Sequence, residues 1–302
     1  MLLLLLATLH TAQNPTDTVL AAARRAVVQL NDTAAARAAG YRPITEIGIP
    51  DNVPFQGQHW SLPIRDTTAA VPLERPAFLM FGPVNGAHRR IGLAYSTRLL
   101  LKEPSPDGLS GDPTAKWHDH FWCDSVPGRP EGFVVNQQEN CGSQGGVLNP
   151  RRAVMVHVWT DVDNPEGVYG HDNPALPFVA LGLTPPTQHE LHDQEKARAI
   201  RKLAWALGEA YDARLPLTRR IERENRDSAL AGSLQQRRKA LAALIPALKR
   251  AEGDRSAYQR AAAQVVSEWE AILGIYERMA SPELRPRVKR RHEAVIAVSA
   301  HH

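Results

Sequence analysis

The stretch Trp117-His118-Asp119-His120-Phe121-Trp122-Cys123 is typical of a β-strand that carries two histidines. Side chains alternate between the two faces of a strand, so His118 and His120 share one face while Trp117, Asp119 and Phe121 take the other. The Cα atoms of the two histidines are then about 7 Å apart, since a strand rises ~3.3 Å per residue. Two imidazoles at this spacing can converge on one metal ion.

A second strand with a histidine is predicted in Val154-Met155-Val156-His157-Val158-Trp159, and a third histidine lies in Gly57-Gln58-His59-Trp60. A metal site needs several ligands held by a stiff frame, which adjacent strands supply, and imidazole suits zinc, copper and iron. We therefore predict a transition-metal site that uses His118, His120 and His157, with His59 as a further ligand.

Two other interpretations of these histidines stay open. They can be structural residues bonded to backbone or to Asp119, or they can act as acid or base without a metal. An enzyme that uses the metal would need an open coordination position to activate water or oxygen. His171, in His171-Asp172-Asn173-Pro174, is ambiguous between a loop residue and a ligand.

Tryptophan stands beside histidine in these segments, which suggests a dry site with aromatic walls. A small-molecule binder is therefore an alternative function. Its pocket would be lined by Trp60, Trp117, Trp122 and Trp159.

The segments before and around the histidines predict an α+β fold. An Ala-rich helix is expected at 19–30, and strands are expected at 78–81, 91–96, 116–123 and 153–160, with a weaker one at 179–183. Pro83-Val84-Asn85-Gly86 should join the first two strands as a hairpin, because Asn-Gly favours positive φ. The N-terminal helix is expected to pack on an antiparallel sheet.

The region 187–302 is predicted to be helical, following the α+β domain at 14–186. Thr187-Gln188-His189-Glu190 has the pattern of a capping box that opens a helix. Apolar residues then recur at helical spacing in three stretches, with Pro246 expected to end or kink the second. A helical hairpin or small bundle follows, and a metal-free assembly protein that forms homo-oligomers through these helices is another candidate function.

The N-terminal run Met1-Leu2-Leu3-Leu4-Leu5-Leu6 resembles the apolar part of a signal peptide at 1–13, which predicts an exported protein, periplasmic or extracellular. Export permits disulfides, and the chain's two cysteines, Cys123 and Cys141, flank a segment rich in Gly, Pro, Asn and Gln. We therefore predict a disulfide between them, worth about 3 kcal/mol by loop closure.

Several classes of function lose support. No apolar run is long enough to predict a transmembrane span, and no nucleotide-binding motif is present. The region from Thr187 onward has 22 Lys and Arg against 15 Asp and Glu, but acidic residues alternate with the basic ones and aromatic residues do not interleave, so nucleic-acid binding is not expected. The spacing in Asp161-Val162-Asp163-Asn164-Pro165-Glu166-Gly167 does not match an EF-hand. Asn164-Pro165-Glu166-Gly167 is interpreted as a turn.

Together these residues resemble a pattern in uncharacterised exported bacterial proteins. The resemblance covers about Thr16 to Pro174, and it implies export and a shared histidine-bearing core but no particular reaction. It is carried by Ala38-Ala39-Gly40-Tyr41, Gly57-Gln58-His59-Trp60, Trp117-His118-Asp119-His120, Cys123, His157-Val158-Trp159 and Asn164-Pro165-Glu166-Gly167.

Overall fold

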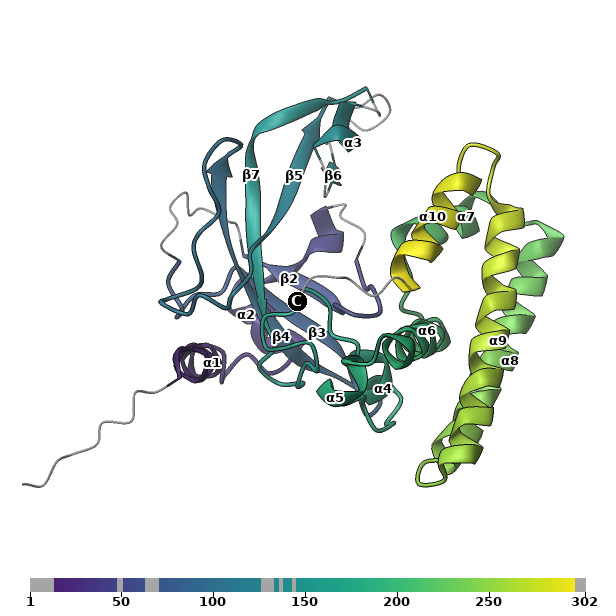
Figure 1. Cartoon of the computed structure of the whole chain (residues 1–302). Coiled ribbons are helices and arrows are strands. Elements are labelled where there is room, and N and C mark those ends of the chain that lie inside the picture. Colours follow the sequence, from purple (N-terminus) through teal and green to yellow (C-terminus); the bar gives the residue numbers. More distant parts are fainter. Residues whose placement is uncertain are drawn as a thin grey trace, which may run out of the picture.

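A computed structural model describes residues 14–47, 51–62, 71–125, 133–135, 138–142 and 145–296 of the chain. The predicted signal peptide at 1–13 lies outside these residues. Within them the fold is α+β, as predicted, with a sheet preceded by helices and followed by a helical segment (Figure 1). No helix of the described residues is both long and apolar enough to cross a membrane.

Seven strands of the described residues form one antiparallel sheet in the order β1-β2-β3-β4-β7-β5-β6. Most of the pairing lies in the long strands β4 and β7 at its centre. The strands are β1 (Arg42–Pro43), β2 (Gln58–Ser61), β3 (Phe78–Val84), β4 (Ala87–Leu100), β5 (His118–Asp124), β6 (Phe133–Val135) and β7 (Val147–Val158).

The turn between β3 and β4 has the predicted chemistry. Asn85 and Gly86 both adopt positive φ, at 49° and 78°, as a tight hairpin turn between twisted strands requires. The strands predicted at 78–81, 91–96, 116–123 and 153–160 correspond to β3, β4, β5 and β7.

The weaker strand predicted at 179–183 is wrong. Val179 and Ala180 instead end the short helix α4 (Leu176–Ala180), which begins with Pro177 in its first turn. Gly182 follows with φ of 66°, a conformation that suits a glycine after a helix. A short buried apolar run has no period that separates strand from helix, which explains the error.

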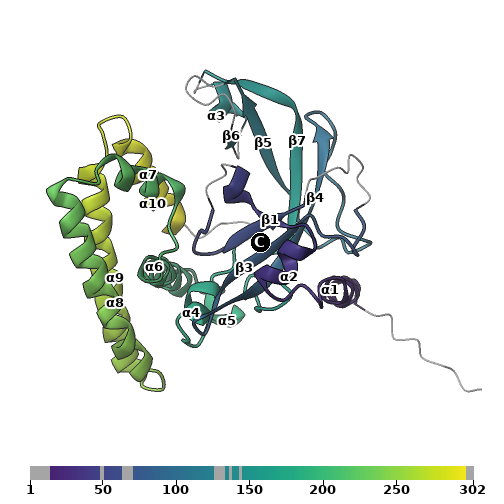
Figure 2. The same cartoon turned by 180° about the vertical axis from the view of Figure 1, so that it is seen from behind.

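One face of the sheet is covered by α1 (Pro15–Ala26) and α2 (Thr33–Ala38). Val19, Ala23 and Val27 pack there against strand residues such as Leu93 and Val156, all of them buried. The long helices of the C-terminal segment lie on the other side of the sheet from α1, as Figures 1 and 2 both show.

The C-terminal segment is a helical bundle, as predicted, and its core also takes in Phe55 and Phe178 from outside the segment. Thr187 and Glu190 form the expected capping box at the start of α5. The buried side chains of the core include Leu207, Leu241, Trp269 and Tyr276. The helices are α5 (Gln188–Leu191), α6 (Gln194–Ala210), α7 (Pro216–Glu224), α8 (Ala229–Arg250), α9 (Arg255–Met279) and α10 (Arg285–Ile296).

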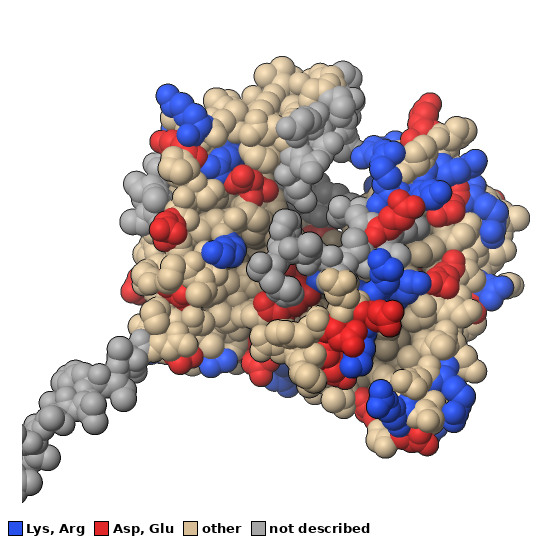
Figure 3. All heavy atoms as spheres, in the orientation of Figure 1, with Lys and Arg blue, Asp and Glu red and all other residues tan. Residues whose placement is uncertain are grey.

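Pro246 does not end its helix, because α8 continues to Arg250. Proline removes one hydrogen bond of a helix, but Leu241, Ile245 and Leu248 bury the same stretch of α8 in the bundle. Acidic and basic side chains are interspersed over the bundle surface (Figure 3), and some of them pair, such as Arg237 with Glu268 and Lys202 with Glu270.

Cys123 and Cys141 form the predicted disulfide, with their Cα atoms 5.5 Å apart. The bond joins β5 to the one-turn helix α3 (Glu139–Gly142). Cys123, Cys141 and Phe121 bury one another in a small apolar cluster at this end of the sheet.

Candidate functional site

The sheet places the predicted histidines on one face. His118 pairs with Met155 and His120 with Ala153 across the β5–β7 ladder, so both side chains share the face of His157, two residues beyond Met155. The pairings of β2, β3 and β4 continue this face to His59. This is the sheet face away from α1.

The imidazole rings of these residues lie close together. Ring centres are 4.9 Å apart for His118 and His120, 5.0 Å for His118 and His157, and 5.6 Å for His59 and His157. Asp119 points to the opposite face, as its place in the alternation predicts, and pairs there with Arg152.

A fifth ring, from His171, joins this cluster. Its centre lies 4.4 Å from that of His118 and 5.4 Å from that of His157, so these three rings form a closed triangle. We call His59, His118, His120, His157 and His171 the histidine cluster. The sequence prediction left His171 ambiguous because it comes from a loop rather than a strand.

Side chains of β7 and of the loop itself hold His171 in place. His157 donates from Nδ1 to the carbonyl of His171 at 2.7 Å, and Trp159 donates from Nε1 to the carbonyl of Gly170 at 2.7 Å. Asn164 lies in the stretch interpreted as a turn, and it donates to the carbonyl of Asp172 at 2.9 Å.

The hydrogen-bond partners at Nδ1 bear on the tautomers of three of the rings. A carbonyl oxygen can only accept, so His157 carries its proton on Nδ1 and keeps a lone pair on Nε2. Nδ1 of His59 lies 3.2 Å from a carboxylate oxygen of Asp51, and Nδ1 of His171 lies 3.1 Å from one of Asp172. A carboxylate also only accepts, so the same tautomer fits His59, as in histidines that bind metals through Nε2. The ring of His171 also has the amide nitrogen of Gln56, a donor, 3.2 Å from Nδ1 and 3.3 Å from Nε2.

His118 has a buried ring nitrogen without a partner. Its Nε2 is shielded from solvent and makes no hydrogen bond to the described residues. Buried polar atoms are nearly always satisfied, so such an atom calls for an explanation such as a bound ion or water.

Burial and crowding both disfavour charge on the central rings. Desolvation lowers the pKa of His118 far below its usual 6.5, and the neighbouring histidines lower it further. Burial and the charges of His171 and His59 also hold the pKa of His157 well below 6.5. Both rings are therefore neutral at pH 7, the form in which imidazole binds metals.

The carboxylate of Asp172 stays ionised beside this cluster. Burial opposes its charge, but hydrogen bonds from His171 and Gln56 and the charge of Arg201 outweigh that effect and lower its pKa. Gln56 donates to Asp172 at 2.9 Å, and its amide nitrogen lies 3.2 Å from Nδ1 of His171. Asp51, Gln56 and Asp172 were not predicted from sequence, because only the fold reveals which residues reach the histidines.

The predicted aromatic pocket is not formed. Trp60 and Trp117 alternate with the histidines beside them, so both point to the α1 side of the sheet and pack in its core. Trp159 lies in a different core, with Met80 and Ile91, and Trp122 belongs to neither cluster. Trp60 and Trp117 thus lie on one side of the sheet, while Trp159 lies on the side of His157, with ring centres 5.8 Å apart.

As the side chains are placed, no three of the His, Cys, Asp and Glu residues in the described part of the chain form a group that could hold a metal ion. Rotation of an imidazole about its Cβ–Cγ bond moves its nitrogens much more than its centre, and this torsion is soft. Ring centres are therefore the better measure of which side chains can reach a common point.

No protein-family model, curated protein or solved structure matches this chain. What the chain does is therefore inferred from the geometry of the histidine cluster and its surroundings.

Proposed function

We propose that this protein binds a transition-metal ion through Nε2 of His118, His157 and His171. His59 and His120 flank these ligands, one beside His157 and the other beside His118. The observation that carries the proposal is the closed triangle of ring centres, with sides of 4.4, 5.0 and 5.4 Å.

These separations fit a shared ion. An imidazole bound at ~2.1 Å has its ring centre about 3.2 Å from the metal, so two such rings at roughly 90–120° have centres about 4.5–5.5 Å apart. The Nδ1 partner of His157 and the unpartnered Nε2 of His118 support the same arrangement.

The ligand set suggests which ion is bound and what it could do. Imidazole alone suits zinc, copper or iron better than magnesium or calcium, which prefer oxygen ligands. Three histidines leave one tetrahedral position for water, as in catalytic zinc sites. His171 is the exposed member of the triangle, so the open position would face solvent on its side.

Export is part of the proposal. The Cys123–Cys141 disulfide supports an oxidising compartment, because such bonds are rare in the cytosol of most organisms. The proposed protein is therefore a periplasmic or extracellular metal-binding protein.

The test is metal binding by untagged protein that has been stripped with EDTA and dialysed. Titration with Co²⁺, followed by its visible absorption, and with Zn²⁺ in competition should show one tight site. Loss of a residue that only supports a metal ligand lowers metal affinity about 10–100-fold. Loss of a ligand itself should lower the affinity more. We therefore expect His118→Ala, His157→Ala and His171→Ala each to lower Co²⁺ affinity at least ~100-fold.

His88→Ala is the matched control, because His88 lies on β4 outside the cluster and stacks on Phe81. It should bind Co²⁺ as the wild type does. Wild-type protein that binds no Co²⁺, Zn²⁺ or Cu²⁺ would overturn the proposal and leave structural histidines or a metal-free assembly protein. Equal binding by the triangle variants would overturn the assignment of ligands.

A further inference from the structure

Residues 51–57, which we call the site loop, touch the histidine cluster along one side. Asp51 accepts hydrogen bonds from the backbone N–H and from Nδ1 of His59. Gln56 reaches both His171 and Asp172. The site loop therefore contacts two of the five histidines, through two different side chains.

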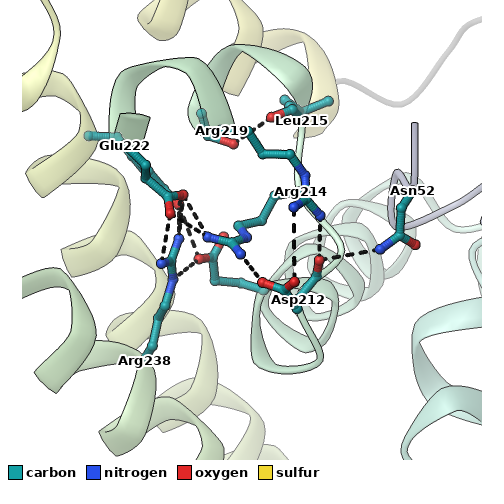
Figure 4. Close-up of polar contacts among 10 residues, drawn as sticks. Asn52, Asp212, Arg214, Leu215, Arg219, Glu222 and Arg238 are labelled. Carbon is teal, nitrogen blue, oxygen red and sulfur yellow. Dashed lines mark hydrogen bonds and ion pairs between the residues drawn. The ribbon is translucent and has the colours of Figure 1, made fainter. Parts of the chain in front are cut away.

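The opposite side of the site loop is held by the end of α6 and the turn after it, residues 205–214, which we call the bundle corner. Arg214 donates its backbone N–H to the carbonyl of Asn52 at 3.2 Å, and the Tyr211 hydroxyl donates to the carbonyl of Pro54 at 3.2 Å. The Phe55 ring packs on Trp205 with centres 4.8 Å apart. Figure 4 shows the contact of the Asn52 amide with Asp212.

The bundle corner is itself fixed by a partly buried ionic cluster. Arg214 donates to Glu222 of α7 at 2.6 and 2.7 Å, and Arg238 of α8 also donates to Glu222 (Figure 4). Arg238 reaches Glu209 of α6 as well, and Tyr276 of α9 donates to Glu222 at 2.7 Å. One polar cluster thus joins the four helices α6, α7, α8 and α9. Its member Arg214, in the bundle corner, also bonds to the site loop.

The contact between the two parts is tight. A Cβ at Gly208, in the bundle corner, would lie 2.7 and 2.8 Å from two ring atoms of Pro54. Asn52 and Asp212 face each other across the contact with left-handed φ of 68° and 72°, which neighbouring structure must hold in place.

We propose that the helical bundle positions the histidine cluster by holding the site loop, so that Asp51 and Gln56 orient the rings of His59 and His171. Its bearing on metal affinity rests on the function proposed above. The physical link runs from the ionic cluster through Arg214 and Asn52 to Asp51, and from Trp205 through Phe55 to Gln56. In this view the bundle acts as an internal partner of the site.

The test is Gly208→Ala, compared with Gly274→Ala in α9. Both add one methyl group to a helix, but the added Cβ at Gly274 would have only an Arg278 side-chain atom nearby, at 3.8 Å. Tyr211→Phe is a second variant that removes only the hydroxyl bonded to Pro54 and keeps the ring.

Two measurements are made on each variant. Long-range ¹H–¹⁵N spectra of the metal-free protein report the tautomer and environment of each imidazole. Gly208→Ala and Tyr211→Phe should shift the ring signals of His59 and His171, while Gly274→Ala should leave them unchanged. Co²⁺ affinity should fall about 10–100-fold in Gly208→Ala, the range for lost outer-shell support, and stay at the wild-type value in Gly274→Ala.

The outcomes separate the two proposals. Imidazole spectra of Gly208→Ala and Tyr211→Phe that match those of Gly274→Ala would overturn the positioning role, whatever the metal result. Shifted spectra in a protein that binds no Co²⁺ would keep the positioning role and overturn the metal site.

Discussion

Acid should destabilise the metal-free protein in the range where histidine titrates. The pKa values of His118 and His157 are lowered by burial and by neighbouring histidines, so both rings stay neutral in the fold while they take up protons in the unfolded chain. A group whose folded pKa is lowered in this way contributes no pH dependence above the unfolded value of 6.5 and costs stability as the pH falls below it.

The size of the effect follows from the pKa of about 6.5 that histidine has in an unfolded chain. Each histidine that stays neutral when folded costs about 1.4 kcal/mol at pH 5.5 and about 0.1 kcal/mol at pH 7.5. Two such residues should therefore lower the free energy of unfolding by ~2.7 kcal/mol between these pH values. The carboxylates with lowered pKa, such as Asp112 and Glu222, lose their contribution only at lower pH.

The assay is urea denaturation in EDTA at pH 7.5, 6.5 and 5.5, followed by circular dichroism. His157→Gln should remove about half of the decrease, because one of the two neutral rings is gone. His189→Gln, at an exposed position of α5, is the control and should keep the full decrease. A free energy of unfolding that is equal at pH 7.5 and 5.5, or a decrease unaffected by His157→Gln, would refute the reasoning.

Two further predictions concern stability. Denatured, unreduced protein should contain no free thiol. The double variant Cys123→Ala/Cys141→Ala should lose about 3 kcal/mol of unfolding free energy, because the disulfide closes a loop between residues 18 apart. Two titratable thiols, or urea unfolding that the double variant leaves unchanged, would contradict this prediction. Trp269→Ala should lose about 3–5 kcal/mol of unfolding free energy, because this side chain is 3% exposed in the core of the bundle. Trp205→Ala, at a half-buried position of the same core, should lose less. A melting temperature that Trp269→Ala leaves unchanged would count against the bundle as described.

The fold could be predicted where side chains repeat with a clear period. The alternation around His118 and His120 predicted both their shared face and the opposite direction of Asp119. The same rule places Trp60 and Trp117 on the other side of the sheet from the histidines, which is why these tryptophans do not join the histidines in one pocket.

The histidine cluster was predictable only in part, for a physical reason. Strand residues inherit their positions from the ladder, whereas His171 is placed by hydrogen bonds from His157, Trp159 and Asn164 to the backbone of its loop. Such contacts form between segments that fold together and leave no periodic signal in the sequence. The contacts of the site loop were even less predictable from sequence, because its partners in the bundle corner lie some 160 residues away in the chain.

This distance has a consequence for the order of events during synthesis. The histidines of the cluster and the site loop all precede residue 172, but the bundle corner ends at Arg214. At ~5–20 residues per second, the ribosome needs roughly 10–30 s to pass from the site loop to the corner. The last cluster histidine, His171, is made late in this interval, so for about 2–9 s before Arg214 is reached the nascent chain carries all five histidines without the contacts that orient two of them. We therefore expect the proposed site to take up metal after the chain is complete and not during its synthesis.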